Sequence, residues 1–374
     1  MKQHEIIKTF GTDYRAMTTR LLEEAHLRDH IPPTARCIGI KPNLVSADPA
    51  EYGGTTHPEV VGGIIDYLRK WYSGRIVILE GSWVGGITTE AFEVCGYNDL
   101  ARECGVELWD MQKDTSSPRD CAGLELNVCD KVTEVDFLIN VPVLKGHCQT
   151  KVTCALKNMK GLLPNKEKRR FHALGLHEPI GHLSAGIHQD FIVVDHICGD
   201  LDFEDGGHPV VVNCVMAACD PVLVDAYAAD LLHYETDDIP YIRIAESVGV
   251  GSADISKMSI RVIGENVVEE LPRTDKIVEL KDAVQEVESC SACYGYLIPA
   301  LDQLREEGLW EAFREAFPEQ LCIGQGFRGK TGRFGIGNCT RDFEFNVPGC
   351  PPTETAIYEA LKAEILRHRG EINE

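Results

Sequence analysis

The sequence predicts an α/β protein with a mostly parallel, helix-flanked sheet, followed by a smaller C-terminal region of different character. Two observations support this class. Short runs of branched residues alternate with helical patterns along most of the chain, as in repeated β-α-β units. From about residue 276 the alternation ends and cysteines and glycines become frequent. We therefore expect an α/β domain over residues 1–275 and a cysteine-bearing region over residues 276–374.

The expected elements follow one another in alternating order. Strands are expected at residues 37–45, 75–80, 106–109, 136–143, 191–196 and 259–264. Helices are expected at residues 57–71, 88–104, 152–159, 221–232 and 239–251, and an amphipathic helix from residue 354 ends the chain. The run DFLINVPV is apolar almost throughout, as is typical of a parallel strand buried on both faces.

Charge and composition exclude several classes of protein. The chain has 59 acidic and 37 basic residues and a formal net charge of −22, which argues against a surface for nucleic acid or anionic membranes. The N-terminus lacks a long apolar segment, and no stretch approaches the roughly 20 apolar residues that a membrane span needs. We therefore expect a cytoplasmic protein without nucleic-acid or membrane partners.

Fifteen cysteines are many for a chain of this kind, because cytoplasmic thiols stay reduced and disulfides are rare there. Several are expected to be buried as small apolar residues: Cys37, Cys95, Cys104, Cys154, Cys198, Cys214 and Cys219. Another four form a close pair and two distant singles: Cys290, Cys293, Cys339 and Cys350. Four thiolates in loops rich in glycine and proline can surround one cuboidal cluster, so a 4Fe-4S cofactor is predicted.

Zinc is the main alternative, because tetrahedral zinc sites also use Cys-x2-Cys pairs. A structural zinc ribbon usually has two such pairs, whereas here the second half consists of isolated cysteines. The stretch Pro-Gly-Cys-Pro-Pro around Cys350 resembles a cluster-ligand segment in small subunits of hydrogenases and related respiratory complexes. Cys322 could replace Cys339 as a ligand, although its apolar surroundings favour a buried thiol.

A basic segment stands out in this acidic chain. Residues 143–172 have a local excess of seven positive charges and begin where an apolar strand ends, the edge at which open parallel sheets bind ligands. We expect a site for a small molecule that carries phosphate or carboxylate, with four binding residues: Lys145, His147, Lys151 and Lys157. The candidates for catalysis are Lys145, His147 and His172, with His177 as a further acid–base candidate. Residues 166–170 are expected to form a solvated basic loop.

Other strand ends offer further candidates for the same site. Lys41 and Asn43 lie toward the carboxyl end of one expected strand, and Glu80 and Ser82 lie at the carboxyl end of the next. No phosphate-binding fingerprint accompanies them, so ordinary turns are an equal alternative. Asp195 or His196, in the strand FIVVDH, could face the same crevice.

The order of several motifs resembles an uncharacterised family, domain of unknown function 362, over residues 36–265. The motifs are KPNLV, HPEVVGGIIDYL, EGS, a GY-x-x-LA segment, DFLINVPVLKGH and ALKNMKGLLP, followed by His172. The family is often described as iron–sulfur cluster-binding, and many members carry a ferredoxin-like module. This chain lacks the tandem Cys-x2-Cys-x2-Cys-x3-Cys-Pro runs of that module, so the resemblance implies a one-cluster site of different design. The Lys-Gly-His loop is also distantly similar to lactate-racemase-type proteins.

Three classes of function remain open. The first is a redox protein or oxidoreductase, of anaerobic metabolism, that acts on a small anionic substrate or on a partner's cofactor. The second is a non-redox isomerase or lyase in which the cluster is a Lewis acid or a structural element. The third is a maturation protein that delivers a cluster or metal. A redox partner protein and self-association into homo-oligomers are compatible with these classes.

Overall fold

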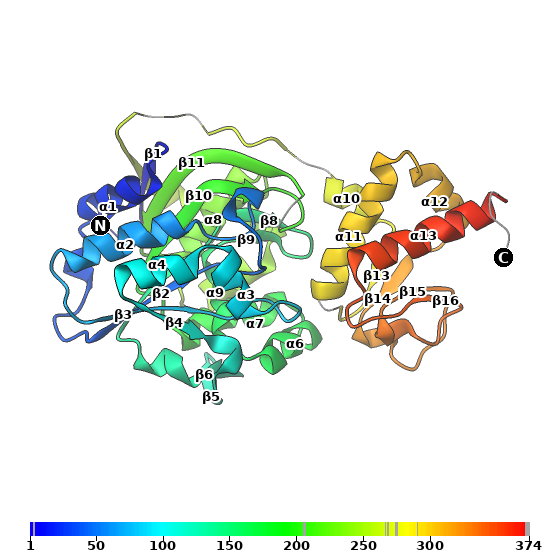
Figure 1. Cartoon of the computed structure of the whole chain (residues 1–374), viewed down its shortest axis with the longest axis horizontal. Helices are drawn as coiled ribbons and strands as arrows, with labels where there is room; N and C mark the ends of the chain where they lie inside the picture. Colours follow the sequence, from blue (N-terminus) through cyan, green and yellow to red (C-terminus); the bar gives the residue numbers. More distant parts are fainter. Residues whose placement is uncertain are drawn as a thin grey trace. The chain divides into compact units, whose positions relative to one another are not determined.

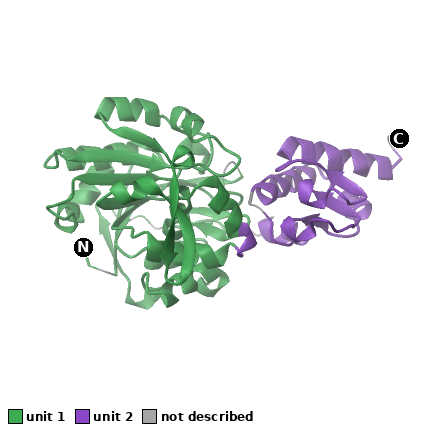
Figure 2. Cartoon of the chain, turned by 90° about the horizontal axis from the view of Figure 1, so that it is seen from below, with its two compact units in different colours: residues 1–171, 176–273 green, residues 172–175, 274–374 purple. Residues whose placement is uncertain are grey.

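A computed structural model describes residues 1–2, 4–204, 207–265, 267, 269–273, 276–289 and 291–370 of the chain. These residues form two compact units (Figure 2). Unit 1 comprises residues 1–171 and 176–273, and unit 2 comprises residues 172–175 and 274–374. Within the described part of the chain, no helix combines the length and apolar character that crossing a bilayer requires.

Unit 1 is built on a large mixed sheet (Figure 1). Its strand order is β12-β1-β11-β10-β7-β2-β3-β4. Five of its neighbouring pairs are parallel, and the pairs β1–β11 and β10–β11 are antiparallel. Its strands are β1 (Glu5–Phe10), β2 (Cys37–Pro42), β3 (Arg75–Glu80), β4 (Glu107–Asp110), β7 (Phe137–Val141), β10 (Phe191–Asp200), β11 (Pro209–Ala218) and β12 (Ser259–Ile263). The predicted α/β class with a mostly parallel, helix-flanked sheet is therefore confirmed.

Helices and two small hairpins complete unit 1. The hairpins pair β5 (Ser116–Cys121) with β6 (Leu124–Cys129), and β8 (Lys145–His147) with β9 (Lys151–Thr153). The helices are α1 (Tyr14–Glu24), α2 (Pro58–Arg69), α3 (Thr88–Val94), α4 (Tyr97–Cys104), α5 (Ala155–Asn158), α6 (Asn165–Ala173), α7 (His177–Gly186), α8 (Pro221–Leu231) and α9 (Pro240–Ser247).

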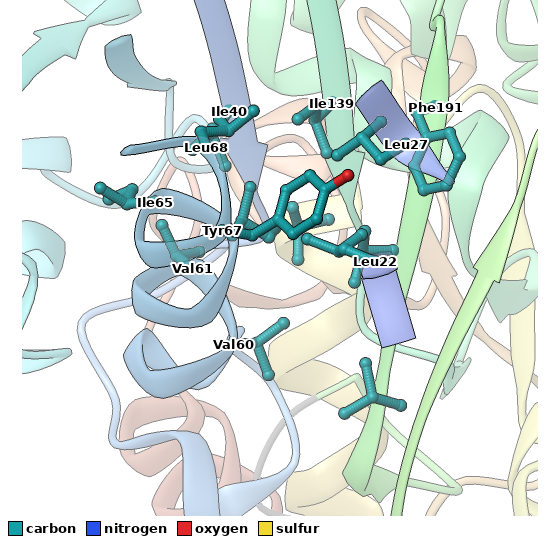
Figure 3. Close-up of a cluster of buried hydrophobic side chains, with 14 of the residues drawn as sticks. Leu22, Leu27, Ile40, Val60, Val61, Ile65, Tyr67, Leu68, Ile139 and Phe191 are labelled. Atoms are coloured by element: carbon teal, nitrogen blue, oxygen red, sulfur yellow. The ribbon is translucent and has the colours of Figure 1, made fainter. Parts of the chain in front are cut away.

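One face of the large sheet is covered by α1 to α4 through a continuous apolar core (Figure 3). Ile40 and Ile139, which pair on adjacent strands, and Leu68 of α2 all belong to this core, and all three side chains are fully buried. Helix α2 supplies this face with branched residues at helical spacing, while its Pro58 occupies the first turn, where no backbone N–H is needed. The chain thus buries the apolar side of each strand and leaves the strand ends to polar side chains.

Unit 2 contains a smaller parallel sheet with the strand order β13-β14-β15-β16. The strands are β13 (Val284–Glu286), β14 (Leu321–Ile323), β15 (Phe334–Ile336) and β16 (Phe345–Val347). The helices are α10 (Lys276–Lys281), α11 (Ser291–Glu306), α12 (Trp310–Ala316) and α13 (Glu354–His368). Fully buried Leu297, Leu301 and Leu361 belong to α11 and α13, which pack together.

Three sequence-based expectations differ from the structure in detail. The helix expected at residues 152–159 is only α5, because residues 151–153 pair with β8 as a strand. The helix expected at residues 88–104 divides at Gly96, whose φ of 77° interrupts it. The segment 166–170, expected as a solvated loop, lies in α6. Strands β1 and β11 were missing from the prediction, and they add the antiparallel part of the sheet.

Candidate functional site

Three of the residues predicted to bind an anion meet at one carboxylate of unit 1. Glu204 Oε1 lies 2.8 Å from Lys157 Nζ and 3.7 Å from Lys145 Nζ, and its Oε2 lies 3.1 Å from His147 Nε2. Lys145 and His147 are almost fully buried, and Lys157 is 7% exposed. We call Lys145, His147 and Lys157 the basic cluster. Charged groups buried to this degree require a partner of opposite sign, which Glu204 supplies.

The Lys-Gly-His sequence has a steric reason at its centre. A Cβ atom on Gly146 would lie 2.1 Å from the carbonyl oxygen of Leu201, so only glycine lets β8 approach the segment after β10 this closely. That segment carries Glu204. Lys145 is further fixed by the bond that its Nζ donates to the Gly54 carbonyl, at 2.7 Å. The close approach therefore brings the carboxylate within reach of the basic cluster.

His147 is a neutral imidazole whose Nε2 lies 3.1 Å from the Glu204 carboxylate. Its Nδ1 accepts bonds from the backbone N–H groups of Gln149 and Thr150, at 2.9 and 3.1 Å. A ring nitrogen that accepts carries no proton, so the proton of the neutral ring is on Nε2, which faces Glu204. Burial lowers the pKa of His147 to about 4, against the opposing influence of Glu204. The site thus combines two ammonium groups with one neutral N–H donor.

The charge state of Glu204 follows from the same neighbours. Burial alone would raise the pKa of Glu204, but His147, Lys157 and Lys145 outweigh it and lower that pKa well below its ordinary value. Glu204 is therefore a carboxylate at neutral pH. With two ammonium groups and one carboxylate, the cluster keeps an excess positive charge.

The remaining candidates from the basic segment lie elsewhere. Lys151 pairs with Asp238 at 3.3 Å and lies over the ring of Tyr234. His172 is buried on α6 and falls within the residues assigned to unit 2. His177 begins α7 and stacks on Tyr241. In unit 1 the structure brings Lys145, His147 and Lys157 together at Glu204, whereas Lys151, the register partner of His147 in the β8–β9 hairpin, pairs with Asp238 instead.

Lys41 lies in a buried polar network at the ends of β2, β3 and β7. Its Nζ donates to Glu80 Oε2 at 2.7 Å, to the Pro42 carbonyl at 2.7 Å and to Asn158 Oδ1 at 3.1 Å. Asn158 in turn donates to Asn140 Oδ1 at 2.7 Å. An ammonium group has three donors, and here all three are used within the protein. These contacts favour a structural role for Lys41, which joins three strand ends to α5.

Asn43 and Ser82, the other predicted binding residues, also bond to neighbouring backbone. Asn43 Oδ1 accepts from the N–H of Val45, two residues on, which is the pattern of an Asx turn. The Ser82 hydroxyl donates to the Leu44 carbonyl at 2.7 Å. Both side chains therefore shape the loops at the ends of β2 and β3.

Lys168 differs from the expectation of a solvated basic loop. It is 4% exposed, and its Nζ donates to the carbonyls of Gly81 and Ser82, both at 2.7 Å. Burial lowers the pKa of Lys168 to about 8. Helix α6 places this one cation inward and its neighbours Arg169 and Arg170 outward, a distinction that composition alone does not make.

His57 and Asp195 form a buried pair that was not predicted from the sequence. Asp195 Oδ2 accepts from both the backbone N–H of His57, at 2.7 Å, and its Nδ1, at 2.8 Å. Burial opposes ionisation of His57, but Asp195 outweighs it and raises the pKa of His57. The pairing directs the Nδ1 proton to Asp195, which leaves Nε2 able to take up a proton. Of this pair, the sequence indicated Asp195 alone, because it is an acidic residue inside the apolar strand FIVVDH.

The N-terminus of α5 is already occupied by an internal carboxylate. Asp225 of α8 is fully buried and accepts from the backbone N–H of Leu156, with both distances at 3.3 Å. Burial raises the pKa of Asp225 to about 7, although these N–H bonds oppose the rise. The sequence predicted that an anion binds near a helix N-terminus. At α5 the side chain of Asp225 takes that position.

This pKa predicts a pH-dependent stability. Because the pKa of Asp225 lies above its ordinary value of 3.8, the folded chain binds more protons than the unfolded chain between about pH 4 and pH 7. The free energy of unfolding should therefore fall as pH rises through this window, by about 2–3 kcal/mol between about pH 5 and pH 8. In Asp225→Asn that fall should disappear from urea-unfolding curves. Asp230→Asn, an exposed change on the same helix, should leave it intact.

The predicted cluster ligands lie on neighbouring loops of unit 2. Cys339 and Cys350 each come three residues after a strand, β15 and β16, whose carboxyl ends share one edge of the parallel sheet. Their loops are joined by bonds from Asn338 N–H to the Gly349 carbonyl, at 2.8 Å, and from Gly349 N–H to Asn338 Oδ1, at 2.9 Å.

A third thiol faces the same loops. Cys293, in the first turn of α11, has its Sγ 3.4 Å from where a Cβ on Gly337 would lie, and Gly337 has a φ of 89° that favours glycine. Cys350 is exposed, and Cys293 and Cys339 are partly exposed. Cys290 lies outside the described residues. Among the residues that are described, no three histidine, cysteine or acidic side chains are grouped as a single metal ion would require.

Comparisons with known proteins place these observations in a wider context. The thylakoid-associated protein sll1697 of Synechocystis sp. is 23% identical over 247 residues, which cover 64% of this chain and 76% of that protein. The lactate racemase apoprotein from Thermoanaerobacterium thermosaccharolyticum is 15% identical, with a TM-score of 0.42, and covers 60% of this chain. A protein from Thermotoga maritima is 12% identical, with a TM-score of 0.36, and covers 67% of this chain. The chain spans 57% and 61% of these two solved structures, respectively.

A family model gives the family assignment. It is described as domain of unknown function 362 and matches residues 38–230, more than half of the chain. The matched range includes most of β2, the basic cluster, Glu204 and the His57–Asp195 pair, and it ends before the cysteines of unit 2. On this match, the chain belongs to the family of domain of unknown function 362.

Proposed function

We propose that this chain is a 4Fe-4S redox protein, acting as an oxidoreductase on a small anionic substrate or on a partner's cofactor. Unit 2 would hold the cluster through Cys290, Cys293, Cys339 and Cys350. Unit 1 would bind the anion through the basic cluster. When bound, the iron–sulfur group supplies one-electron transfer.

The observation that carries the proposal is the arrangement of the thiols in unit 2. Cys339 and Cys350 follow parallel strands at one sheet edge, on loops bonded to each other, and Cys293 Sγ faces Gly337 of the first loop. A cuboidal cluster is larger than a single ion and takes thiolates from several loops, so this spread suits a cluster better than zinc. Gly337, which has no side chain, leaves space beside the Cys293 sulfur atom.

The residues of unit 1 support the second half of the proposal. Lys145 and Lys157 provide charge, and His147 provides a neutral N–H that donates without taking up a proton. Such a set orients an anion. In this reading His147 and the two lysines position the substrate, and a different group transfers protons. The His57–Asp195 pair has the chemistry of such a group, and His172 remains a predicted alternative.

A second candidate is a non-redox isomerase or lyase with a structural cluster. The buried His57–Asp195 pair favours it, because a histidine with raised pKa can move protons without any electron transfer. The reducibility of the cluster distinguishes the two candidates.

The test is anaerobic purification of the full chain with analysis of iron, sulfide and zinc, and with absorption and electron paramagnetic resonance spectra before and after dithionite. We expect about four irons and four sulfides per chain and a visible absorption band that dithionite bleaches. A cluster that resists reduction would favour the isomerase or lyase. One zinc without sulfide would overturn the cluster assignment.

A further inference from the structure

We propose that the Glu204 carboxylate holds the place of a substrate carboxylate in the basic cluster, so that the ligand of this site is a small carboxylate that displaces Glu204. This inference rests on the anion-binding half of the proposed function and adds the class of anion and an internal competitor.

The geometry matches a two-oxygen anion. Oε1 is shared between Lys157 Nζ at 2.8 Å and Lys145 Nζ at 3.7 Å, while Oε2 faces His147 Nε2 at 3.1 Å. The two oxygens of one planar group thus face different basic side chains. A ligand carboxylate can reproduce this pattern oxygen for oxygen, whereas a tetrahedral phosphate presents additional oxygens for which these contacts provide no donor.

The backbone of Glu204 is held in a conformation that its side chain does not favour. Its φ is 109°, a region that residues with a Cβ rarely adopt and that is typical of strained functional positions. Just before it, Asp200 Oδ1 accepts from the N–H groups of Asp202, at 2.7 Å, and Phe203, at 3.0 Å. These bonds hold the segment that leads to Glu204 against β10. The contacts with the basic cluster offset the strain, and a ligand that replaces them would release it.

The charges require an anion whether or not Glu204 is present. Lys145 is completely buried and Lys157 nearly so, and Lys160 adds a further positive charge that contributes to the low pKa of His147. With Glu204 displaced, two buried ammonium groups would lack their carboxylate, which is strongly unfavourable unless another anion enters. The side chain therefore serves as a removable occupant of the site.

The experiment compares the full-length wild type with Glu204→Ala, using acetate and inorganic phosphate as probes. We expect Glu204→Ala to melt below the wild type in anion-free buffer, and acetate to restore its melting temperature. Calorimetric titration should show acetate binding at least about tenfold tighter than in the wild type. Glu90→Ala, which removes one exposed carboxylate of unit 1, should behave as the wild type.

Two further variants keep the test decisive. Glu204→Gln retains the volume of the side chain, so it can replace Glu204→Ala in the test if that variant does not fold. We expect Glu204→Gln to bind acetate with an affinity between those of the wild type and Glu204→Ala. Adding Lys157→Met to Glu204→Gln should abolish acetate binding.

The outcomes separate this inference from the proposed function. Equal acetate affinity in the wild type and both Glu204 variants, with dependence on Lys157, would overturn the displacement while leaving the anion site in place. Binding of phosphate but not acetate by Glu204→Ala would overturn the carboxylate assignment. No anion binding by any variant would overturn the anion-binding half of the proposed function itself.

Discussion

Cys339→Ser and Cys350→Ser are each expected to cause near-complete loss of iron, sulfide and the visible absorption band from the anaerobically purified chain. Each thiol is one of four proposed ligands, and a serine hydroxyl is a much poorer ligand for iron than a thiolate. Cys293→Ser should have the same effect, because its Sγ faces the loop that leads to Cys339. Iron and sulfide analysis against protein concentration measures the loss.

Cys322→Ser is the matched control for these variants. Its Sγ donates to Gln285 Oε1 at 3.3 Å within the sheet of β14, and burial raises its pKa, which favours the thiol over the thiolate. We expect this variant to retain full cluster content. If Cys322→Ser loses the cluster and Cys339→Ser retains it, then Cys322 is a ligand and Cys339 is not. A cluster that survives replacement of any one thiol would indicate three-thiolate ligation with an open iron.

Lys41→Met is expected to lower the free energy of unfolding by about 3–5 kcal/mol, the range for removing one partner of a buried ion pair. Lys41 and Glu80 are 0% and 3% exposed at their side chains and lie 2.7 Å apart. Burial lowers the pKa of Lys41, and Glu80 opposes that shift. The carboxylate thus stabilises the charged form of the buried lysine. Without the ammonium group, the buried carboxylate would lose its closest cation and keep the hydrogen bonds from the Leu44 and Gly81 N–H groups. Urea unfolding of both proteins measures the difference.

Two comparisons make this result specific to the buried pair. Lys41→Met combined with Glu80→Gln should recover part of the stability, because no uncompensated charge then remains. Lys70→Met removes one partner of the exposed Lys70–Glu23 pair, whose side chains are 50% and 53% exposed, and should change stability by less than about 1 kcal/mol. An effect of Lys41→Met no larger than that of Lys70→Met would contradict the structural role of Lys41.

The main lines of the fold could be predicted because they depend on local patterns. The expected strand at residues 75–80 coincides with β3, and the expected helix at residues 221–232 ends one residue beyond α8. The strand β11 was missed although it is long and directly follows β10 in the chain. Its other partner, β1, lies near the start of the chain. Pairing of that kind depends on tertiary contacts.

The candidate site divides in the same way. Lys145, His147 and Lys157 could be proposed from their position after an apolar strand, and the structure gathers them at one carboxylate. That carboxylate, Glu204, is 57 positions from His147 in a loop without a recognisable motif. Lys168 could not be distinguished from its exposed neighbours by composition, since only the packing of α6 decides which side faces inward.

By itself, the sequence determined the alternation of strands and helices, the basic segment and the spacing of the cysteines. These features follow from hydrophobic periodicity, from glycine and proline and from residue type, which act over a few neighbouring positions. Only the tertiary structure decided that Glu204 meets the basic cluster, that Asp195 pairs with His57 and that Asp225 lies at α5. Each of these contacts joins segments far apart in the chain, and burial makes such a partner necessary for a charge without specifying which residue will provide it.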